Sequence, residues 1–99
     1  MEQKVSMLGE SVDYYKINCK GKIFPLKIYF THVKNSFRFL ASFKNMFPSE
    51  ETADYDFIVN KAIRRTFNPE KQKNVETLFI CLQAKNSIGM MSMRISFYN

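Results

Sequence analysis

The stretch Pro25–Lys44, PLKIYFTHVKNSFRFLASFK, constrains this chain more than any other, because apolar residues occupy alternate positions on both sides of a polar segment, His32–Ser36. The apolar residues are Leu26, Ile28 and Phe30 before that segment, and Phe37, Phe39, Ala41 and Phe43 after it. Successive side chains leave an extended backbone in opposite directions, so a period of two predicts strands that pack on one side. We expect two strands folded back on the polar turn as a β-hairpin.

The same alternation predicts strands along the rest of the chain. They are expected at Gln3–Leu8, Ser11–Cys19, Ala53–Val59, Ala62–Phe67, Val75–Ala84 and Met91–Phe97. The last two are expected to pair as a closing hairpin, and single helical turns are expected at Ser49–Thr52 and Asn68–Lys73. Seven to eight short strands with short connections predict an all-β fold, an antiparallel β-sandwich with jelly-roll or Greek-key wiring.

Length and composition indicate one globular domain over residues 1–99. The chain is 45% hydrophobic and 24% charged, which is typical of folded proteins. No run of about 18 apolar residues is present, so no membrane span is expected, and the first residues do not have the pattern of a secretory signal. Two cysteines, Cys19 and Cys81, are too few for a disulfide framework and suit a reducing compartment. These features predict an intracellular protein.

The formal net charge of +6 suits an acidic partner, although lysine-rich strands also keep a β-protein soluble. Basic residues collect in three predicted turns. The candidate basic interaction surface consists of Lys20, Lys22, Lys61, Arg64, Arg65, Lys71 and Lys73. If these turns share one end of the sandwich, they form a patch beside Tyr14, Phe24 or Phe67, and basic grooves with stacking aromatics hold single-stranded nucleic acid. Most phenylalanines follow the buried phase, which disfavours nucleic acid as the partner.

No catalytic or metal-binding motif is recognisable in the sequence. There is no nucleophile elbow, no Cys/His motif and no glycine-rich phosphate loop. Asp54 and Asp56 project from the same face of a predicted strand and could bind calcium, but a solvated acidic edge explains them better. His32 is the single histidine, and Cys19 and Cys81 lie at no recognised zinc spacing from it. We therefore expect no cofactor, no metal and no enzymatic activity.

The order of features resembles that of the bacterial pre-peptidase C-terminal domain, over roughly Leu8 to Phe97. The residues that carry the resemblance are Gly9, Val12–Ile17 (VDYYKI), Gly21, Pro25–Phe30, Asn35–Ser42 (NSFRFLAS), Pro48, Tyr55, Asp56, Leu78–Ala84 and Met91–Phe97. The resemblance implies a small jelly-roll-like sandwich that serves as a non-catalytic accessory module. Bacterial members accompany secreted enzymes, whereas this chain has no expected signal and is expected to act as a solitary domain.

Similar solitary sandwiches look like components of large eukaryotic assemblies, including ciliary ones. By this analogy the expected function is that of a non-catalytic protein-interaction or structural subunit of an intracellular assembly in the cytoplasm, of cytoskeletal or ciliary type. Its expected partner is an acidic protein such as tubulin, which would make it microtubule-associated. The alternative is a ligand-binding module for carbohydrate or single-stranded nucleic acid.

Overall fold

The computed structural model describes residues 2–69, 75–85 and 88–98 and is all-β. Its strands are β1 (Glu2–Met7), β2 (Val12–Asn18), β3 (Ile23–Lys34), β4 (Phe37–Ser42), β5 (Tyr55–Val59), β6 (Ile63–Phe67), β7 (Thr77–Ala84) and β8 (Gly89–Tyr98). Each predicted strand is confirmed with boundaries shifted by at most two residues, except that β3 continues through His32 to Lys34. The described residues contain no helix that is long and apolar enough to cross a membrane.

Of the two predicted helical turns, the structure describes one. The N–H of Ala53 donates to the carbonyl oxygen of Ser49 at 2.9 Å, which closes one helical turn at Ser49–Thr52 as predicted. The other, at Asn68–Lys73, falls mostly outside the described residues.

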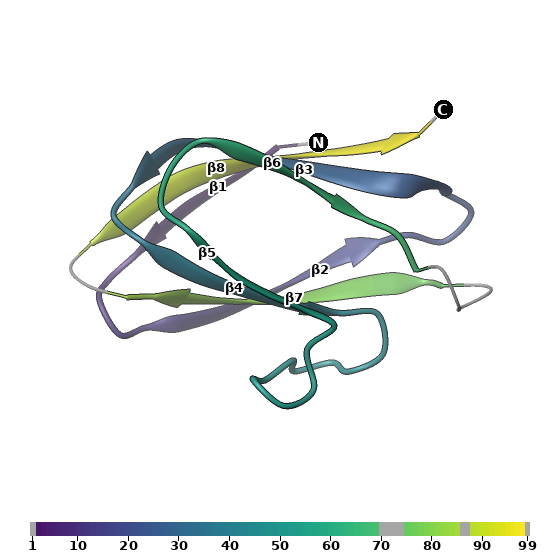
Figure 1. Cartoon of the computed structure of the whole chain (residues 1–99), viewed down its shortest axis with the longest axis horizontal. Helices are drawn as coiled ribbons and strands as arrows, with labels where there is room; N and C mark the ends of the chain where they lie inside the picture. The colour runs from purple at the N-terminus through teal and green to yellow at the C-terminus, as the bar shows by residue number, and fades with distance from the viewer. Residues whose placement is uncertain (1, 70–74, 86–87, 99) are drawn as a thin grey trace.

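The strands form two four-stranded antiparallel sheets that face each other, with orders β1-β8-β3-β6 and β2-β7-β4-β5 (Figure 1). Apart from β4 and β5, consecutive strands lie in different sheets. This is the wiring of a jelly roll, in which the chain passes repeatedly from one layer to the other. The predicted β-sandwich of jelly-roll type is therefore confirmed.

Both predicted hairpins are wrong. Strand β3 pairs with β6 and β8, whereas β4 pairs with β5 and β7, so neither β3 with β4 nor β7 with β8 forms a ladder. At the end of β3 the register shifts between Thr31 and Lys34, and His32 and Asn35 take positive φ angles of 53° and 66°. Such an irregularity bends a strand, and here it accompanies the passage of the chain to the opposite sheet. Alternation shows which face a side chain occupies but carries no information about the neighbouring strand.

The inward faces of the two sheets meet in a core rich in phenylalanine. Phe39 of β4 lies at its centre, with ring centroids 5.4 Å from Phe30 of β3, 4.8 Å from Phe57 of β5 and 5.7 Å from Phe67 of β6. Phe39, Phe30 and Phe67 are fully buried. Because these rings come from both sheets, the cluster fastens one layer of the sandwich to the other.

The outer face of the β2-β7-β4-β5 sheet is partly covered by the segment 43–54, which joins β4 to β5 and lies outside that sheet (Figure 1). Leu40 and Cys81 pair across this face and are each only 1% exposed. The alternation placed Leu40 on the outward side of its strand. It is buried because a sheet face that carries a covering segment no longer faces water.

Candidate functional site

The structure separates the basic residues that the sequence grouped by their turns. Lys20 and Lys22 lie in the connection before β3, and Lys61 lies in the connection before β6. The start of β6 pairs with Phe30 and its end pairs with Leu26, so these two connections are at opposite ends of the sandwich. Lys71 and Lys73 lie outside the described residues.

Arg64 and Arg65 are neighbours on β6 and point to opposite faces of the sheet. The Arg65 guanidinium lies 3.9 Å from the centroid of the Phe57 ring, which belongs to the facing sheet. It therefore covers the open side of the sandwich between β6 and β5, where an inward-pointing charge also discourages the addition of another strand. Arg64 pairs with Tyr29 and lies on the outer face.

That outer face, on the β1-β8-β3-β6 sheet, gathers more cations than any predicted turn. The registers place on it the cations Lys4, Lys27, Lys34, Arg64 and Arg94, the aromatic residue Tyr29 and one acid, Glu2. We call this set without Glu2 the basic face. All its cations are exposed except the half-buried Lys27. In the described part of the chain, ion pairs involve only Arg38, so the cations of the basic face are available to a ligand.

Tyr29 occupies the centre of the basic face. It pairs with Arg94 on one side and with Arg64 on the other, and the Arg94 guanidinium lies 4.6 Å from the centroid of its ring. Directly opposed residues on a sheet have Cβ atoms about 5 Å apart, so the side chains of both arginines start beside Tyr29. Guanidiniums present forked donors that match a carboxylate, and the contact with the ring limits the conformations of Arg94.

A shallow cavity adjoins the basic face near the end of β3. It has a volume of about 310 Å³ and is lined by Lys4, Val5, Ser6, His32, Met90, Met91 and Ser92. His32 is an exposed residue of the irregular end of β3 rather than of a turn between hairpin strands. Lys4 borders both features, so the cavity extends the basic face toward β1.

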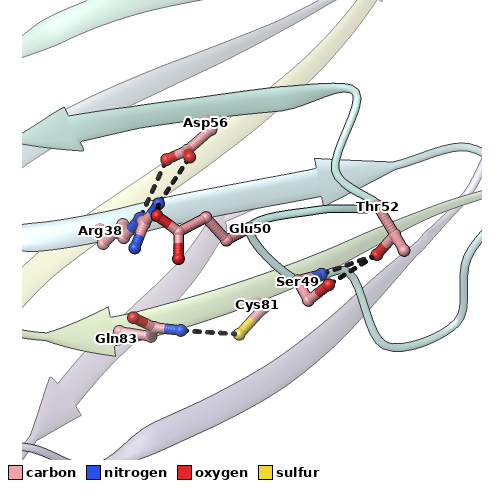
Figure 2. A network of polar contacts seen from close by, with 7 residues as sticks. All are labelled: Arg38, Ser49, Glu50, Thr52, Asp56, Cys81 and Gln83. Atoms are coloured by element: carbon pink, nitrogen blue, oxygen red, sulfur yellow. Dashed lines mark hydrogen bonds and ion pairs between the residues drawn. The ribbon is translucent and has the colours of Figure 1, made fainter.

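An ion-pair cluster holds the segment 43–54 on the β2-β7-β4-β5 sheet, the sheet opposite the basic face (Figure 2). Arg38 donates through Nε and Nη2 to the two carboxylate oxygens of Asp56, at 3.0 and 2.7 Å, and its Nη2 lies 3.3 Å from Glu50 Oε1. Ser42 Oγ donates to Asp54 at 3.1 Å and accepts from the backbone N–H of Asn45 at 3.0 Å. Asp54 and Asp56, the pair weighed as a calcium site, are thus engaged by donors of the protein itself.

We expect the Arg38–Asp56 pair to make stability depend on pH. Hydrogen bonding to Arg38 lowers the pKa of Asp56 below its ordinary value of 3.8. The unfolded chain therefore binds more protons, and the stability that this carboxylate contributes is present above about pH 3.8 and is lost as pH falls through the lower pKa of the folded state. In the Asp56→Asn variant, the free energy of unfolding should fall less steeply as pH is lowered, a decline that we call the acid limb. Urea titration at a series of pH values measures it.

The matched control for this prediction is the Arg38→Gln background. There the Asp56→Asn substitution should leave the acid limb unchanged, because the carboxylate has already lost its partner. Parallel acid limbs for the unsubstituted protein and Asp56→Asn would show that the pair does not couple folding to protons.

The structure brings no three His, Cys, Asp or Glu side chains together as a metal site within residues 2–69, 75–85 and 88–98. Cys19 and Cys81 are free and buried, and burial raises the pKa of both thiols. Neutral buried thiols are poor ligands and poor nucleophiles, because the thiolate is the reactive form. Both cysteines pack as small apolar residues.

Of the basic face, the sequence prediction included Arg64 but missed Lys4, Lys27, Tyr29, Lys34 and Arg94. The signal was present, since the alternation put Lys27, Tyr29 and Arg94 on the outward phase of their strands, but only the strand order makes them neighbours. The chain matches no known family model, no curated protein and no solved structure. The resemblance to the pre-peptidase C-terminal domain therefore stays a prediction.

Proposed function

We propose that this protein is a non-catalytic interaction subunit of a larger intracellular assembly, and that it docks an acidic protein surface through the basic face. The observation that carries the proposal is the row Arg94, Tyr29 and Arg64 across three adjacent strands, with Lys4 and Lys27 beside it. A sheet face that carries two guanidiniums, one of them held against Tyr29, is complementary to the carboxylates of an acidic segment. The cytoskeletal or ciliary setting expected from the sequence supplies the first partner to test, tubulin.

An acidic protein is favoured over single-stranded nucleic acid by the aromatic content of this face. Nucleic-acid grooves hold successive bases on several exposed rings. On the described strands of this sheet, the outward aromatics are Tyr29, which Arg94 contacts, and Tyr98, which lies at the far end of β8. A charged face without several exposed aromatic rings is better suited to bind carboxylates than to stack with nucleic-acid bases.

The test is co-sedimentation with microtubules, together with binding of fluorescein-labelled poly-glutamate, at low and moderate salt. Binding should weaken as salt rises, because these charges are exposed and screened. The triple variant Lys27→Gln, Arg64→Gln, Arg94→Gln should lose roughly tenfold in affinity, which is about 0.5 kcal/mol for each exposed pair.

The matched control removes the same charge elsewhere, with Lys20→Gln, Lys22→Gln and Lys61→Gln. This variant should bind nearly as well as the unsubstituted chain, because its lysines lie in connections at opposite ends of the sandwich. Equal losses of affinity in both variants would show that binding depends only on net charge, which would overturn the proposed site. Tighter binding of a single-stranded oligonucleotide than of both acidic probes would overturn the choice of partner.

A further inference from the structure

A second candidate site lies on the other sheet, along the free edge of β2. Strand β2 is the first in the order β2-β7-β4-β5, so its only ladder within the described residues is with β7. Antiparallel pairs alternate between residues that exchange hydrogen bonds and residues whose backbone groups point away. The hydrogen bonds at the ends of the β2–β7 ladder show which residues of β2 bond to β7 and which have backbone groups that point to the open edge.

Just beyond each end of the ladder, an odd-numbered residue that flanks β2 forms a hydrogen bond with the residue opposite it. The N–H of Glu10, one residue further out, also donates to the carbonyl oxygen of Ala84. The N–H of Cys19 donates to the carbonyl oxygen of Glu76 at 2.7 Å, and the carbonyl oxygen of Ser11 accepts from the N–H of Ala84 at 3.2 Å. The same phase carried along the strand directs the odd residues toward β7. The N–H and C=O groups of Val12, Tyr14 and Lys16 therefore point to the open edge.

Exposed apolar side chains surround this edge. Val12 is 45% exposed, Tyr14 51%, Met46 60% and Phe47 63%. Tyr14 and Phe47 contact each other edge to face, with ring centroids 5.1 Å apart. Exposed apolar groups clustered in this way mark contact sites more often than single exposed residues do. Val12 and Tyr14 are also residues whose backbone groups point to the open edge, whereas Met46 and Phe47 belong to the segment 43–54.

The outer side of β2 also borders a cavity of about 210 Å³. It is lined by Tyr14, Tyr15, Lys16, Met46, Phe47 and Phe79. On the inner side, a smaller cavity of about 30 Å³ is lined by Gln3, Tyr15, Lys16, Ile17, Ile80, Met93 and Ile95. A strand added beside β2 would direct alternate side chains to the outer and inner sides of the sheet. The outer cavity has room for a side chain, whereas the inner cavity has room for about one water molecule.

We propose that the edge of β2 binds an extended segment of a partner protein by strand addition, with one large apolar side chain of that segment in the outer cavity and an acidic residue beside it, on the side toward Lys20. Charge selects the acidic residue, because Lys16 lines the cavity and the exposed Lys20 and Lys22 lie just beyond the C-terminal end of the strand, whereas Glu10 and Asp13 lie toward its start. A second copy of this chain fits less well, since it would join two chains of formal charge +6.

Other edges of the sandwich are less suited to strand addition. Strand β6 carries Arg64 and Arg65, and β1 carries Glu2 and Lys4, which are charges of the kind that discourage pairing. On β2 the outward positions before Lys16 are the apolar Val12 and Tyr14. The remaining edge strand, β5, carries Asp56, which is paired with Arg38, and the Arg65 guanidinium lies over Phe57 on that side of the sandwich. The edge of β2 instead combines Val12 and Tyr14 with the exposed Met46 and Phe47.

The probe is a fluorescein-labelled peptide that contains the segment Glu-Val-Phe-Val-Glu, in which phenylalanine and both glutamates share one face. We expect salt-sensitive binding by fluorescence anisotropy. In amide hydrogen exchange followed by NMR, the N–H groups of Val12, Tyr14 and Lys16 should gain protection on binding. Those of Asp13, Tyr15 and Ile17 should change little, because they already face β7. Absence of this alternation at saturating peptide would overturn the proposal.

Two controls separate strand addition from simple hydrophobic contact. A peptide methylated on its alternate backbone nitrogens keeps its side chains but cannot form the ladder, and it should bind at least tenfold more weakly. The Phe47→Ala variant should also weaken binding, and because Phe47 is largely exposed, this variant should fold. Equal affinity for the methylated and unmethylated peptides would rule out strand addition.

The same experiment distinguishes this site from the basic face. The Lys27→Gln, Arg64→Gln, Arg94→Gln variant should bind the peptide as the unsubstituted chain does, because those residues lie on the opposite sheet. Loss of binding in that variant would assign the peptide to the basic face and overturn the β2 site. Concentration-dependent dimers by sedimentation, with the β2 amides already protected in the absence of peptide, would overturn it in favour of a second copy.

Discussion

The Phe39→Ala variant is expected to have a free energy of unfolding about 3–5 kcal/mol lower than that of the unsubstituted protein, which is the usual cost of truncating a large buried ring. Phe39 is fully buried and contacts Phe30, Phe57 and Phe67 from three other strands. Its removal leaves a cavity between the sheets and takes away contacts that join them. Urea titration followed by circular dichroism measures the loss as a change in the free energy of unfolding.

The matched control is Phe47→Ala, the same change at a ring that is 63% exposed. It should cost under about 1 kcal/mol, as exposed substitutions usually do. If Phe39→Ala leaves too little folded protein to titrate, Phe39→Leu should fall between these two variants. Similar losses for Phe39→Ala and Phe47→Ala would contradict the placement of Phe39 at the centre of the core.

The Gly89→Ala variant is expected to cost about 1–3 kcal/mol, because the core has no room for the added methyl group. A Cβ atom at Gly89 would lie 2.7 Å from Cζ of Phe37 and 3.1 Å from both of its Cε atoms. Phe37 is fully buried, so its ring must move against the packing around it. The midpoint of urea unfolding should fall, while the slope of the free energy of unfolding against urea concentration stays constant.

A double-mutant cycle tests the cause of this loss. In a Phe37→Leu background, the Gly89→Ala substitution should cost less, because the shorter side chain leaves room for the methyl group. Gly21→Ala provides a contrasting case, since nothing lies within 4 Å of its Cβ position but its φ of 72° is unfavourable for alanine. If Gly89→Ala costs the same in both backgrounds, the contact with Phe37 is not the cause.

The sequence predicted the core better than it predicted the sheets. Leu26, Ile28, Phe30, Phe37 and Phe39 were placed inward by alternation alone, and all are fully buried. Side-chain direction in a strand is local, so the period of two is enough to find it. The pairing of strands is not local, and the two predicted hairpins failed because jelly-roll wiring sends consecutive strands to opposite layers.

The candidate site was only partly predictable for the same reason. Arg64 was included as part of a predicted basic turn, although it lies on β6. Lys20 and Lys61, which the sequence grouped with it, lie in connections at opposite ends of the sandwich. Lys27 and Arg94 are far apart in the chain and become neighbours of Tyr29 and Arg64 through the β3 and β8 ladders. A charge cluster on a sheet depends on register, which a single sequence leaves open.

By itself the sequence determined that this chain forms strands, which face of each strand is apolar and that the surface carries excess positive charge. The tertiary structure decided the order of those strands, the basic face on one sheet and the free edge of β2 on the other. The physical reason is that side-chain alternation follows from the geometry of one extended backbone. Strand order, in contrast, is set by which arrangement of all eight strands buries their apolar faces together.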